Sequence, residues 1–329
     1  MGAKRSRNTV ALVRTSDRRR WQEACVASYQ PATAFHDHAW LMLAGGMTGT
    51  SFVPFVVTHD GKDIGVAPLM VRRRGPLSMV NWMPFPYVGP LAPPELLAAT
   101  LDALDRWALR LATVRQQQSF PPQAVVDDAA LIRHRFVLHE DHTYVVPVHA
   151  SQEQQWEALA GRCRTSVRKA QSLGVRIEEA QSGETLGAVV SAAFAARGLR
   201  SGYRAAFPPG PDRLKELGLP VRYTIATLDG SPVGSLAAVE QHGRVLLWQA
   251  GVLPQFRGSQ ANVLLYWDLI GWARDLGARS VDLVGLPDEG IAHFKQQFGG
   301  KLTSYTVARR TSPLLRTLQA ARIRVNARP

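Results

Sequence analysis

The sequence predicts an α/β protein with mixed (α+β) sheets, divided into two domains of similar plan. Its length of 329 residues exceeds the size at which one hydrophobic core is usual, so two domains are expected. The second observation is an Asp-Gly turn between two apolar runs, which occurs at residues 55–65 and again at residues 224–234. In both segments an apolar-Gly pair begins four residues after the aspartate. Asp-Gly in this setting is a strong hairpin signal, and its recurrence with little sequence identity indicates an internal duplication.

Helices and strands alternate through the first half of the chain. Helices are expected at 17–29 and 94–112, and strands at 52–59 and 64–72. Between them, residues 83–91 carry too much proline for a central strand or a helix. We expect this segment to be a shaped loop that presents the ring of Tyr87.

The second half continues as a βαβ-like series. Helices are expected at 151–173 (one helix or two), 183–196, 260–276 and around residues 294–295, and strands at 144–148, 221–228, 233–241, 244–250, 280–284 and 302–309. A proline-glycine segment at 207–211 marks a long loop. We therefore expect a first domain at residues 1–148, a second at 149–311, and a C-terminal helix at 312–329 that joins the first domain.

The formal net charge of +13 is concentrated at the two ends of the sequence. Residues 1–20 hold seven basic residues and one acid, and residues 309–329 hold six basic residues and no acid. The body between them is nearly neutral, so net charge alone is a weak indication of polyanion binding. The basic ends are either solvated tails or segments that attract a phosphate-bearing ligand.

Composition narrows the class of protein further. A hydrophobic content of 46% is ordinary for a soluble globular protein, and no apolar run approaches the roughly 18 residues of a membrane-spanning helix. No secretory signal is evident near the N-terminus. Cys25 and Cys163 lie far apart without metal-type spacing, which favours unpaired thiols in a reducing compartment. We expect a cytoplasmic protein without a transmembrane segment.

The sharpest local motif lies at residues 252–261 and leads into an apolar helix. A strand, a turn of small residues and a helix together expose backbone N–H groups and the positive end of the helix dipole, an arrangement that binds phosphate. An ordinary strand–turn–helix connection is the alternative. The expected donor-binding residues are Gln255, Arg257, Gly258, Ser259, Gln260 and Ala261.

This motif resembles the pyrophosphate loop of the GNAT acetyltransferases, whose pattern is Arg/Gln-x-x-Gly-x-Gly/Ala. Gln255 and Gly258 fit that pattern, whereas Gln260 replaces the usual small residue and Ala261 follows one place later. The departure removes one reason to expect coenzyme A as the donor.

Further segments, in the same order, resemble the FemAB-type branch of the GNAT superfamily over roughly residues 35–308. They are residues 86–91, residues 164–170 with Gly174-Val175, the Gly258 loop, and residues 290–295 with 298–300. The branch includes aminoacyl-tRNA-dependent peptidyltransferases and less defined N-acyltransferases. The resemblance implies two tandem GNAT-like domains, an acyl donor on the second domain, and a Phe294-Lys295 pair at the reacting carbonyl.

The chemistry of acyl transfer agrees with a lysine at that position. Attack of an amine on an ester or thioester builds negative charge on the carbonyl oxygen, and one fixed donor there contributes about 3–4 kcal/mol. Phe294 and Phe298 would bury the short helix and hold Lys295 in place, while a solvated surface lysine is the alternative. Asp282, at a strand end, is a candidate proton acceptor, and Asp288 and Glu289 are further candidates.

The resemblance implies that the region of Arg164, Arg168 and Lys169 contacts phosphates of the acceptor or donor, and Tyr87 is a further candidate for substrate contact. Arg164 and Arg168 have i,i+4 spacing and share a helix face, although a merely solvated face would explain them nearly as well. Tyr87 either meets a substrate or packs within its loop. His36 and His38 form the only histidine cluster, and because no third ligand is apparent no metal site is expected.

These features together predict an acyltransferase that moves an aminoacyl group from aminoacyl-tRNA to an amine or hydroxyl of a small-molecule or cell-wall-precursor acceptor. Direct attack on the activated ester would need no cofactor, with the charged tRNA as co-substrate and partner. An acyl-coenzyme-A-dependent N-acyltransferase is the alternative enzyme. An RNA-binding or assembly protein that retains the fold but lacks chemistry is the non-enzymatic alternative.

Overall fold

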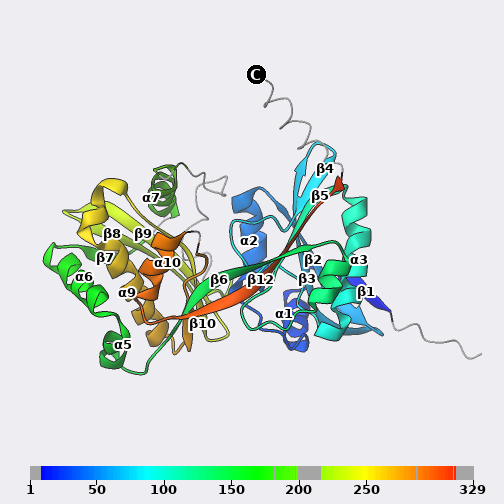
Figure 1. Cartoon of the computed structure of the whole chain (residues 1–329), viewed down its shortest axis with the longest axis horizontal. Helices are drawn as coiled ribbons and strands as arrows, with labels where there is room; N and C mark the ends of the chain where they lie inside the picture. The colour runs from blue at the N-terminus through cyan, green and yellow to red at the C-terminus, as the bar shows by residue number, and fades with distance from the viewer. Residues whose placement is uncertain are drawn as a thin grey trace, which may run out of the picture. The chain divides into compact units, whose positions relative to one another are not determined.

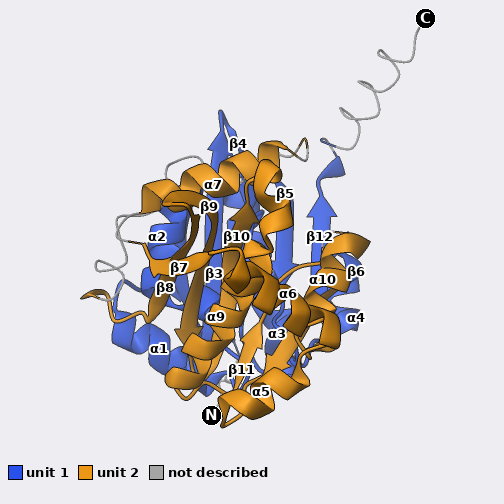
Figure 2. Cartoon of the chain, turned by 90° about the vertical axis from the view of Figure 1, so that its left-hand side faces the viewer, with its two compact units in different colours: residues 1–140, 305–329 blue, residues 141–304 orange. Residues whose placement is uncertain are grey.

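The computed structural model describes residues 9–180, 183–196, 198, 216–286, 288–313 and 315. The chain forms two compact units, residues 1–140 with 305–329 (unit 1) and residues 141–304 (unit 2), as Figure 2 shows. Each unit is a mixed β-sheet with helices packed on it, so the expected α/β class is confirmed. The basic residues before 9, the loop at 207–211 and residues 316–329 of the expected C-terminal helix lie outside the described residues.

Unit 1 is built on a sheet with the strand order β1-β2-β3-β4-β5-β12 (Figure 1). Neighbouring strands are antiparallel except β4 and β5, which are parallel. Its elements are β1 (Val10–Arg14), α1 (Arg18–Ala27), η1 (Ala34–His36), α2 (His38–Thr48), β2 (Ser51–His59), β3 (Lys62–Arg74), β4 (Leu77–Val80), η2 (Pro94–Leu96), α3 (Leu97–Arg110), β5 (Thr113–Ser119), α4 (Asp128–Arg133) and the C-terminal part of β12 (Lys301–Thr311).

Unit 2 has the strand order β6-β11-β10-β9-β8-β7, again with one parallel pair, β10 and β11. α6 and α9 pack on one face of its sheet, and α7 packs on the other. Its elements are β6 (Val137–Pro147), α5 (Gln152–Ala158), α6 (Gly161–Ser172), β7 (Arg176–Glu179), α7 (Gly183–Ala195), β8 (Val221–Leu228), β9 (Ser231–Gln241), β10 (Arg244–Val252), η3 (Pro254–Ser259), α9 (Ala261–Asp275), β11 (Ser280–Asp282) and α10 (Glu289–Gln296).

The strands of the two units repeat one plan. In each unit, hairpins link three antiparallel strands, β2-β3-β4 in unit 1 and β8-β9-β10 in unit 2. The third of these strands pairs in parallel with the next one, β5 or β11, and an antiparallel strand follows, β12 in unit 1 and β6 in unit 2. The β2–β3 and β8–β9 turns match closely, since Asp60 and Asp229 both have φ of 50° and Gly61 and Gly230 have φ of 78° and 75°. Both central residues at positive φ are the mark of a type I′ turn. This shared geometry supports the duplication inferred from the Asp-Gly pattern.

The boundary between the units differs from the expected one because the last strand of each unit comes from the part of the sequence that was expected in the other domain. Residues 145–147 of β6 were expected in the first domain, but they pair with β11 and belong to unit 2. Residues 307–311 of β12 were expected in the second domain, but they pair with β5 and belong to unit 1. Strand pairing between distant segments of the chain determines both positions.

The segment expected to be one helix or two at 151–173 is two helices. Ser151 begins α5, and its hydroxyl accepts a hydrogen bond from the Gln154 amide at 3.2 Å. Leu159 and Ala160 then take extended conformations, with ψ of 143° and 145°, so the chain breaks before α6. The break places α6 against α9 in the core of unit 2.

The proline-rich segment 83–91 is an irregular loop, as expected, but it does not present the ring of Tyr87. That side chain is fully buried, and its ring lies 5.0 Å from the ring of Tyr305 and 6.2 Å from that of Phe35. The Tyr87 amide donates to the Ser119 hydroxyl at 3.0 Å. Tyr87 therefore packs in the interior of unit 1, and the expectation of a presented ring is wrong.

Candidate active site

The site begins where the parallel pair β10 and β11 ends. The two strands pair only between residues 244–246 and 280–282, although β10 continues to Val252. From Gln249 to Val252, the edge of β10 that faces away from β9 pairs with no strand among the described residues. Backbone groups on such an edge can pair with an extended ligand.

A β-bulge interrupts β10 where its unpaired edge begins. Leu247 and Gln249 oppose the consecutive β9 residues Ala238 and Ala237, so Trp248 is an inserted residue. Bulges of this kind bend a strand, change the direction of its side chains, and are over-represented next to active sites. The end of β10 is therefore both unpaired along one edge and bent.

The predicted donor-binding residues lie together in η3 and at the start of α9, directly after β10. Gln255, Arg257 and Gly258 are exposed, and a Cβ added at Gly258 would meet nothing within 4 Å. Ser259 and Ala261 are buried, so these two shape the turn rather than face a ligand. The Ser259 hydroxyl donates to the Phe256 carbonyl at 2.7 Å and accepts from the Ala261 amide at 3.3 Å. The turn thus leads to the amino end of a 15-residue helix.

Gln260, which departs from the GNAT pattern, has an unusual backbone conformation. Its backbone is left-handed, with φ of 60° and ψ of 16°. Glycine adopts this conformation without steric cost, whereas a residue with a Cβ is strained there. Gln260 nevertheless adopts it and is the N-cap residue of α9.

Lys295 does not offer a free ammonium to a substrate carbonyl. It is only 4% exposed, and its ammonium donates to the backbone carbonyls of Leu283, Val284 and Gly285, the last two at 2.6 and 2.7 Å. A lysine ammonium has three protons, so each of its donors is in use. Burial lowers the pKa of Lys295 to about 8, and the Asp282 charge opposes that change. The structure therefore contradicts a free oxyanion donor at this residue.

Asp282 is also buried rather than available to a substrate amine. It is fully buried, and its Oδ1 accepts from the Thr143 hydroxyl at 2.6 Å and from the Val284 amide at 3.0 Å. A general base must come within hydrogen-bond reach of the proton it removes. Asp282 instead anchors the end of β11, and Asp288 accepts from the Ile291 amide at 2.9 Å as the N-cap of α10.

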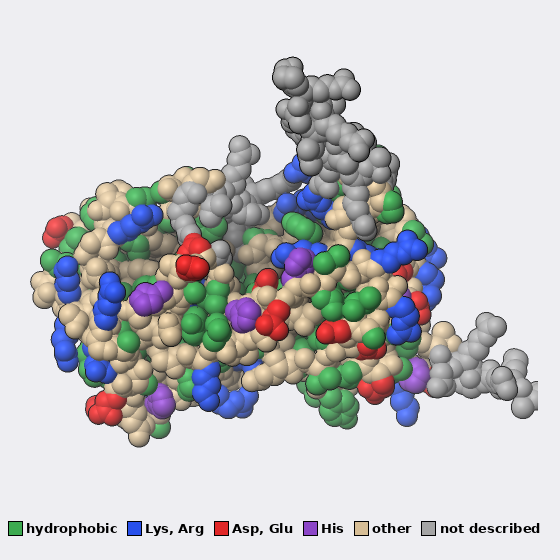
Figure 3. Space-filling model, viewed as in Figure 1, with side chains coloured by type: hydrophobic (Ala, Val, Ile, Leu, Met, Phe, Trp, Pro, Cys, Tyr) green, Lys and Arg blue, Asp and Glu red, His purple; other side chains and the backbone are tan. Residues whose placement is uncertain are grey.

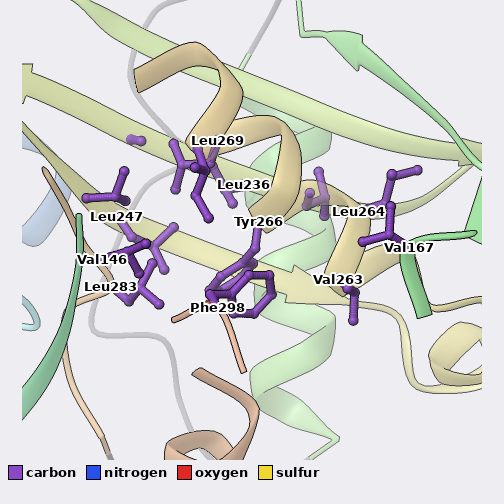
Figure 4. Close-up of a cluster of buried hydrophobic side chains, with 14 of the residues drawn as sticks. Val146, Val167, Leu236, Leu247, Val263, Leu264, Tyr266, Leu269, Leu283 and Phe298 are labelled. Atoms are coloured by element: carbon purple, nitrogen blue, oxygen red, sulfur yellow. The ribbon is translucent and has the colours of Figure 1, made fainter. Parts of the chain in front are cut away.

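The aromatic residues around Lys295 hold α10 as expected. The ring of Phe294 lies 5.0 Å from the ring of Tyr266 and 5.3 Å from that of Phe298. Phe298 is fully buried, and Figure 4 shows its ring beside that of Tyr266 on α9, near Leu283. Phe294 therefore fixes the helix through packing.

The basic residues of α6 divide into two kinds. The guanidinium of Arg164 donates to the Leu159 and Glu157 carbonyls at 2.7 and 3.1 Å, so it caps the end of α5 and is not a free phosphate ligand. Arg168 is exposed, with its guanidinium 5.2 Å from the ring centre of Trp156. Lys169 is exposed next to it. The expected contact with phosphates remains a prediction for Arg168 and Lys169.

Some of the basic residues near the two ends of the chain form ion pairs and hydrogen bonds within unit 1. Arg20 forms a two-pronged ion pair with Asp63, at 2.8 and 2.9 Å, and Arg310 on β12 bonds to Gln116, to Asp105 and to the His134 carbonyl. On the face that Figure 3 shows, Lys and Arg side chains are spread rather than gathered in one patch. The net charge is thus a weaker sign of polyanion binding than its size suggests.

Two polar residues of the site were missed from the sequence. Tyr223 on β8 and Gln249 on β10 both lie opposite Ala237, so they share one face of the sheet. Tyr223 is fully buried and its hydroxyl has no hydrogen-bond partner among the described residues, while Gln249 is 8% exposed. A tyrosine and a glutamine within apolar strands give no distinguishing signal, because only the pairing register brings them together.

Several alternatives find no support among the described residues. No group of three or more His, Cys, Asp or Glu side chains is arranged to hold a metal ion in that part of the chain. Both cysteines are buried and unpaired, and burial raises the pKa of the Cys163 thiol to about 11. No described helix combines the length and apolarity that a bilayer crossing requires.

Residues 159–296 match a family model described as an acetyltransferase (GNAT) domain, which covers the η3–α9 turn and Lys295. No curated protein matches the chain. Among solved structures, FemX is similar with a TM-score of 0.67 and 15% identity, over 89% of this chain and 96% of that one.

Two further structures have the same two-part fold. A tandem GNAT protein from the clavulanic acid biosynthesis pathway has a TM-score of 0.59 and 13% identity, over 92% of this chain and 98% of that one. The C-terminal domain of a putative lysylphosphatidylglycerol synthetase from Agrobacterium fabrum has a TM-score of 0.55 and 12% identity, over 93% and 97%.

Fold and family model together support a GNAT-type acyltransferase domain at residues 159–296. Residues 159–296 match the acetyltransferase (GNAT) domain model, and the fold of the chain is similar to that of FemX. The resemblance and the fold expected from the sequence motifs are confirmed.

Proposed function

We propose that this acyltransferase moves an aminoacyl group from aminoacyl-tRNA to an amine or hydroxyl of a small-molecule or cell-wall-precursor acceptor. Two features of unit 2 support donor binding next to β10. The η3–α9 turn offers exposed Arg257 and Gly258 at the amino end of a helix, which attracts a phosphate, and the adjacent β10 edge is unpaired. Their order along the chain fits a donor whose phosphate lies at the turn and whose acyl group lies along β10.

The proposal of aminoacyl-tRNA rather than acyl-coenzyme A as the donor rests on Gln260. The turn keeps a left-handed backbone, yet a long side chain stands where the coenzyme-A-binding pattern has a small residue. A side chain of that length at the N-cap position leaves less room for a pyrophosphate at the amino end of α9 than a small residue would. A donor that presents a single phosphodiester there is less obstructed. The similarity to a domain of a lysylphosphatidylglycerol synthetase, whose named product carries a lysyl group, agrees with an aminoacyl donor.

The proposed reaction is a direct aminolysis or alcoholysis of the tRNA ester. The acceptor nitrogen or oxygen attacks the ester carbonyl, the bond from that carbon to the ribose oxygen breaks, and an amide or a new ester forms. The acceptor proton leaves with the ribose oxygen, which becomes the free hydroxyl of the tRNA. The ester is already activated, so positioning of the two substrates supplies much of the acceleration. Backbone N–H groups of the β10 edge are available to orient the carbonyl.

Acyl-coenzyme A remains the second candidate donor, because one of the similar structures is described with reference to acetyl-coenzyme A. The test supplies the protein with charged tRNA pools labelled in the amino acid and, separately, with labelled acetyl-coenzyme A, each with a cell extract as acceptor source. The proposal expects label to move from tRNA, with binding that weakens steeply between about 50 and 200 mM salt. Transfer from acetyl-coenzyme A alone would overturn it.

A further inference from the structure

The segment that follows β11 is held from two sides. Lys295 donates to the carbonyls of residues 283–285, and Asp282 accepts the Val284 amide at 3.0 Å. The Leu283 amide donates to the Tyr144 carbonyl at 2.9 Å. Three consecutive carbonyls thus converge on one ammonium that is almost completely buried.

The same segment has an unusual backbone. Val284 has φ of 41° and Gly285 has φ of 72°. A β-branched residue at positive φ is a steric outlier, and such a conformation persists only where surrounding contacts enforce it. The bonds from Lys295 and Asp282 are contacts of that kind, since they act on residues 283, 284 and 285 themselves.

The position of this turn matters for the open edge of β10. Pairing of β11 with β10 stops at Asp282, one residue before the first carbonyl that Lys295 binds. If residues 283–285 continued the strand in register, Leu283 would lie opposite Leu247 and the next residues would pair along β10. The left-handed turn instead directs the chain away from that edge.

We propose that Lys295 is a positioning residue that fastens the turn at residues 283–285 and so keeps the carboxyl end of β11 apart from β10. This role rests on the proposed function only in treating the β10 edge as the donor site. It gives the buried ammonium a purpose that does not require it to touch a substrate. The Asp282 carboxylate supplies the compensating charge, as a buried ammonium requires.

Hydrogen exchange of the amides at 283–286 tests this role without any substrate. In Lys295→Ala the three carbonyls lose their donor, and we expect exchange of those amides to accelerate about tenfold or more, while α9 stays protected. Lys301→Ala, an exposed lysine on β12, is the matched control and should change nothing. Unchanged exchange in Lys295→Ala would overturn the proposal.

Chemical rescue distinguishes loss of the hydrogen bonds to residues 283–285 from a general destabilisation of unit 2. Propylammonium chloride brings an N–H-bearing cation that matches the removed Cγ–Nζ group to the space left in Lys295→Ala, and protection at 283–286 should return toward the wild-type value. Tetramethylammonium has the same charge but no N–H, so it should not restore protection. Equal effects of the two salts, or no effect of either, would contradict the proposal. Because exchange needs no donor, this outcome is independent of whether aminoacyl-tRNA proves to be the substrate.

Discussion

Arg222 on β8 and Asp268 on α9 form a two-pronged ion pair in unit 2, with the guanidinium Nε and Nη2 each 3.1 Å from a carboxylate oxygen. Both side chains are about one quarter exposed, at 23% and 24%. Burial raises the pKa of Asp268, and the charge of Arg222 opposes that rise. The pair fixes the helix that begins at the donor turn onto the sheet that carries the open edge.

Replacing Arg222 with Met should therefore destabilise unit 2 in a pH-dependent way. At pH 7 the loss is expected to be roughly 2–3 kcal/mol, because an unpaired carboxylate stays in a mostly buried position. The folded-state pKa of Asp268 then lies further above its unfolded value, so the folded protein binds more protons and regains stability as the pH falls. Urea unfolding at pH 7 and pH 5 measures both effects. The double variant Arg222→Met/Asp268→Leu should return close to wild type, and an equal loss at both pH values would contradict this explanation.

Arg164 and Arg168 should respond differently to substitution, although they lie one turn apart on α6. Arg164→Met removes the cap of α5 and is expected to cost roughly 1–2 kcal/mol of unfolding free energy. Arg168→Met removes an exposed charge, should leave stability within about 0.5 kcal/mol, and should reduce the salt dependence of tRNA binding by roughly one phosphate contact. Denaturant unfolding and filter binding at several salt concentrations measure the two. If Arg164→Met spares stability and weakens binding, the cap assignment is wrong.

Tyr87 should behave as a core residue of unit 1. Tyr87→Ala empties a fully buried position and is expected to lower the free energy of unfolding by roughly 3 kcal/mol or more. Tyr29 is 94% exposed, so Tyr29→Ala provides a control that should change stability by less than about 0.5 kcal/mol. Chemical denaturation compares them. A stable Tyr87→Ala protein with a raised KM for the acceptor would restore the substrate contact that the sequence allowed.

Gln260→Gly tests both the strain in the donor turn and the choice of donor. Glycine removes the cost of a Cβ at φ of 60°, so thermal unfolding should show a gain of about 0.5–1 kcal/mol. The same change clears space at the amino end of α9, and binding of coenzyme A should tighten, as measured by calorimetry. Loss of stability would show that the Gln260 side chain makes contacts that outweigh the strain. Unchanged coenzyme A binding would show that this side chain is not the obstruction.

Local sequence signals predicted the elements that have local causes. The Asp60-Gly61 and Asp229-Gly230 turns determine their hairpins through the φ values that glycine and aspartate tolerate, and both hairpins are confirmed. β5 was missed because residues 116–118 are three glutamines, which are uncommon in a buried strand. Each of these glutamines finds a distant partner, Arg310, Arg309 and Asn81 in turn, which no local pattern reveals.

The candidate site was found in part for the same reason. The turn from Gln255 to Ala261 is contiguous in sequence, so the motif predicted its strand–turn–helix form, while its role in donor binding stays a prediction. Phe294 was expected to pack around its helix, and its ring contacts that of Tyr266. The direction of the Lys295 side chain was not predictable, because it depends on a left-handed turn ten residues earlier in the chain. The positions of β6 and β12 likewise depend on pairing between distant segments of the chain, and for this reason the domain boundary differs from the expected one.

Gly258 offers the most direct test of acyl transfer at the η3–α9 turn. Gly258 and Gly46 are both exposed and both leave open space for a Cβ, so glutamate should be accommodated at either position. Transfer of labelled aminoacyl groups from charged tRNA to an extract is the measurement, made with Gly258→Glu, with Gly46→Glu in unit 1 and with the unaltered protein. We expect Gly258→Glu to lose about tenfold or more in kcat/KM for the charged tRNA, because a carboxylate repels phosphate at the helix terminus, while Gly46→Glu keeps full activity. Equal transfer by all three proteins would contradict a donor site at this turn.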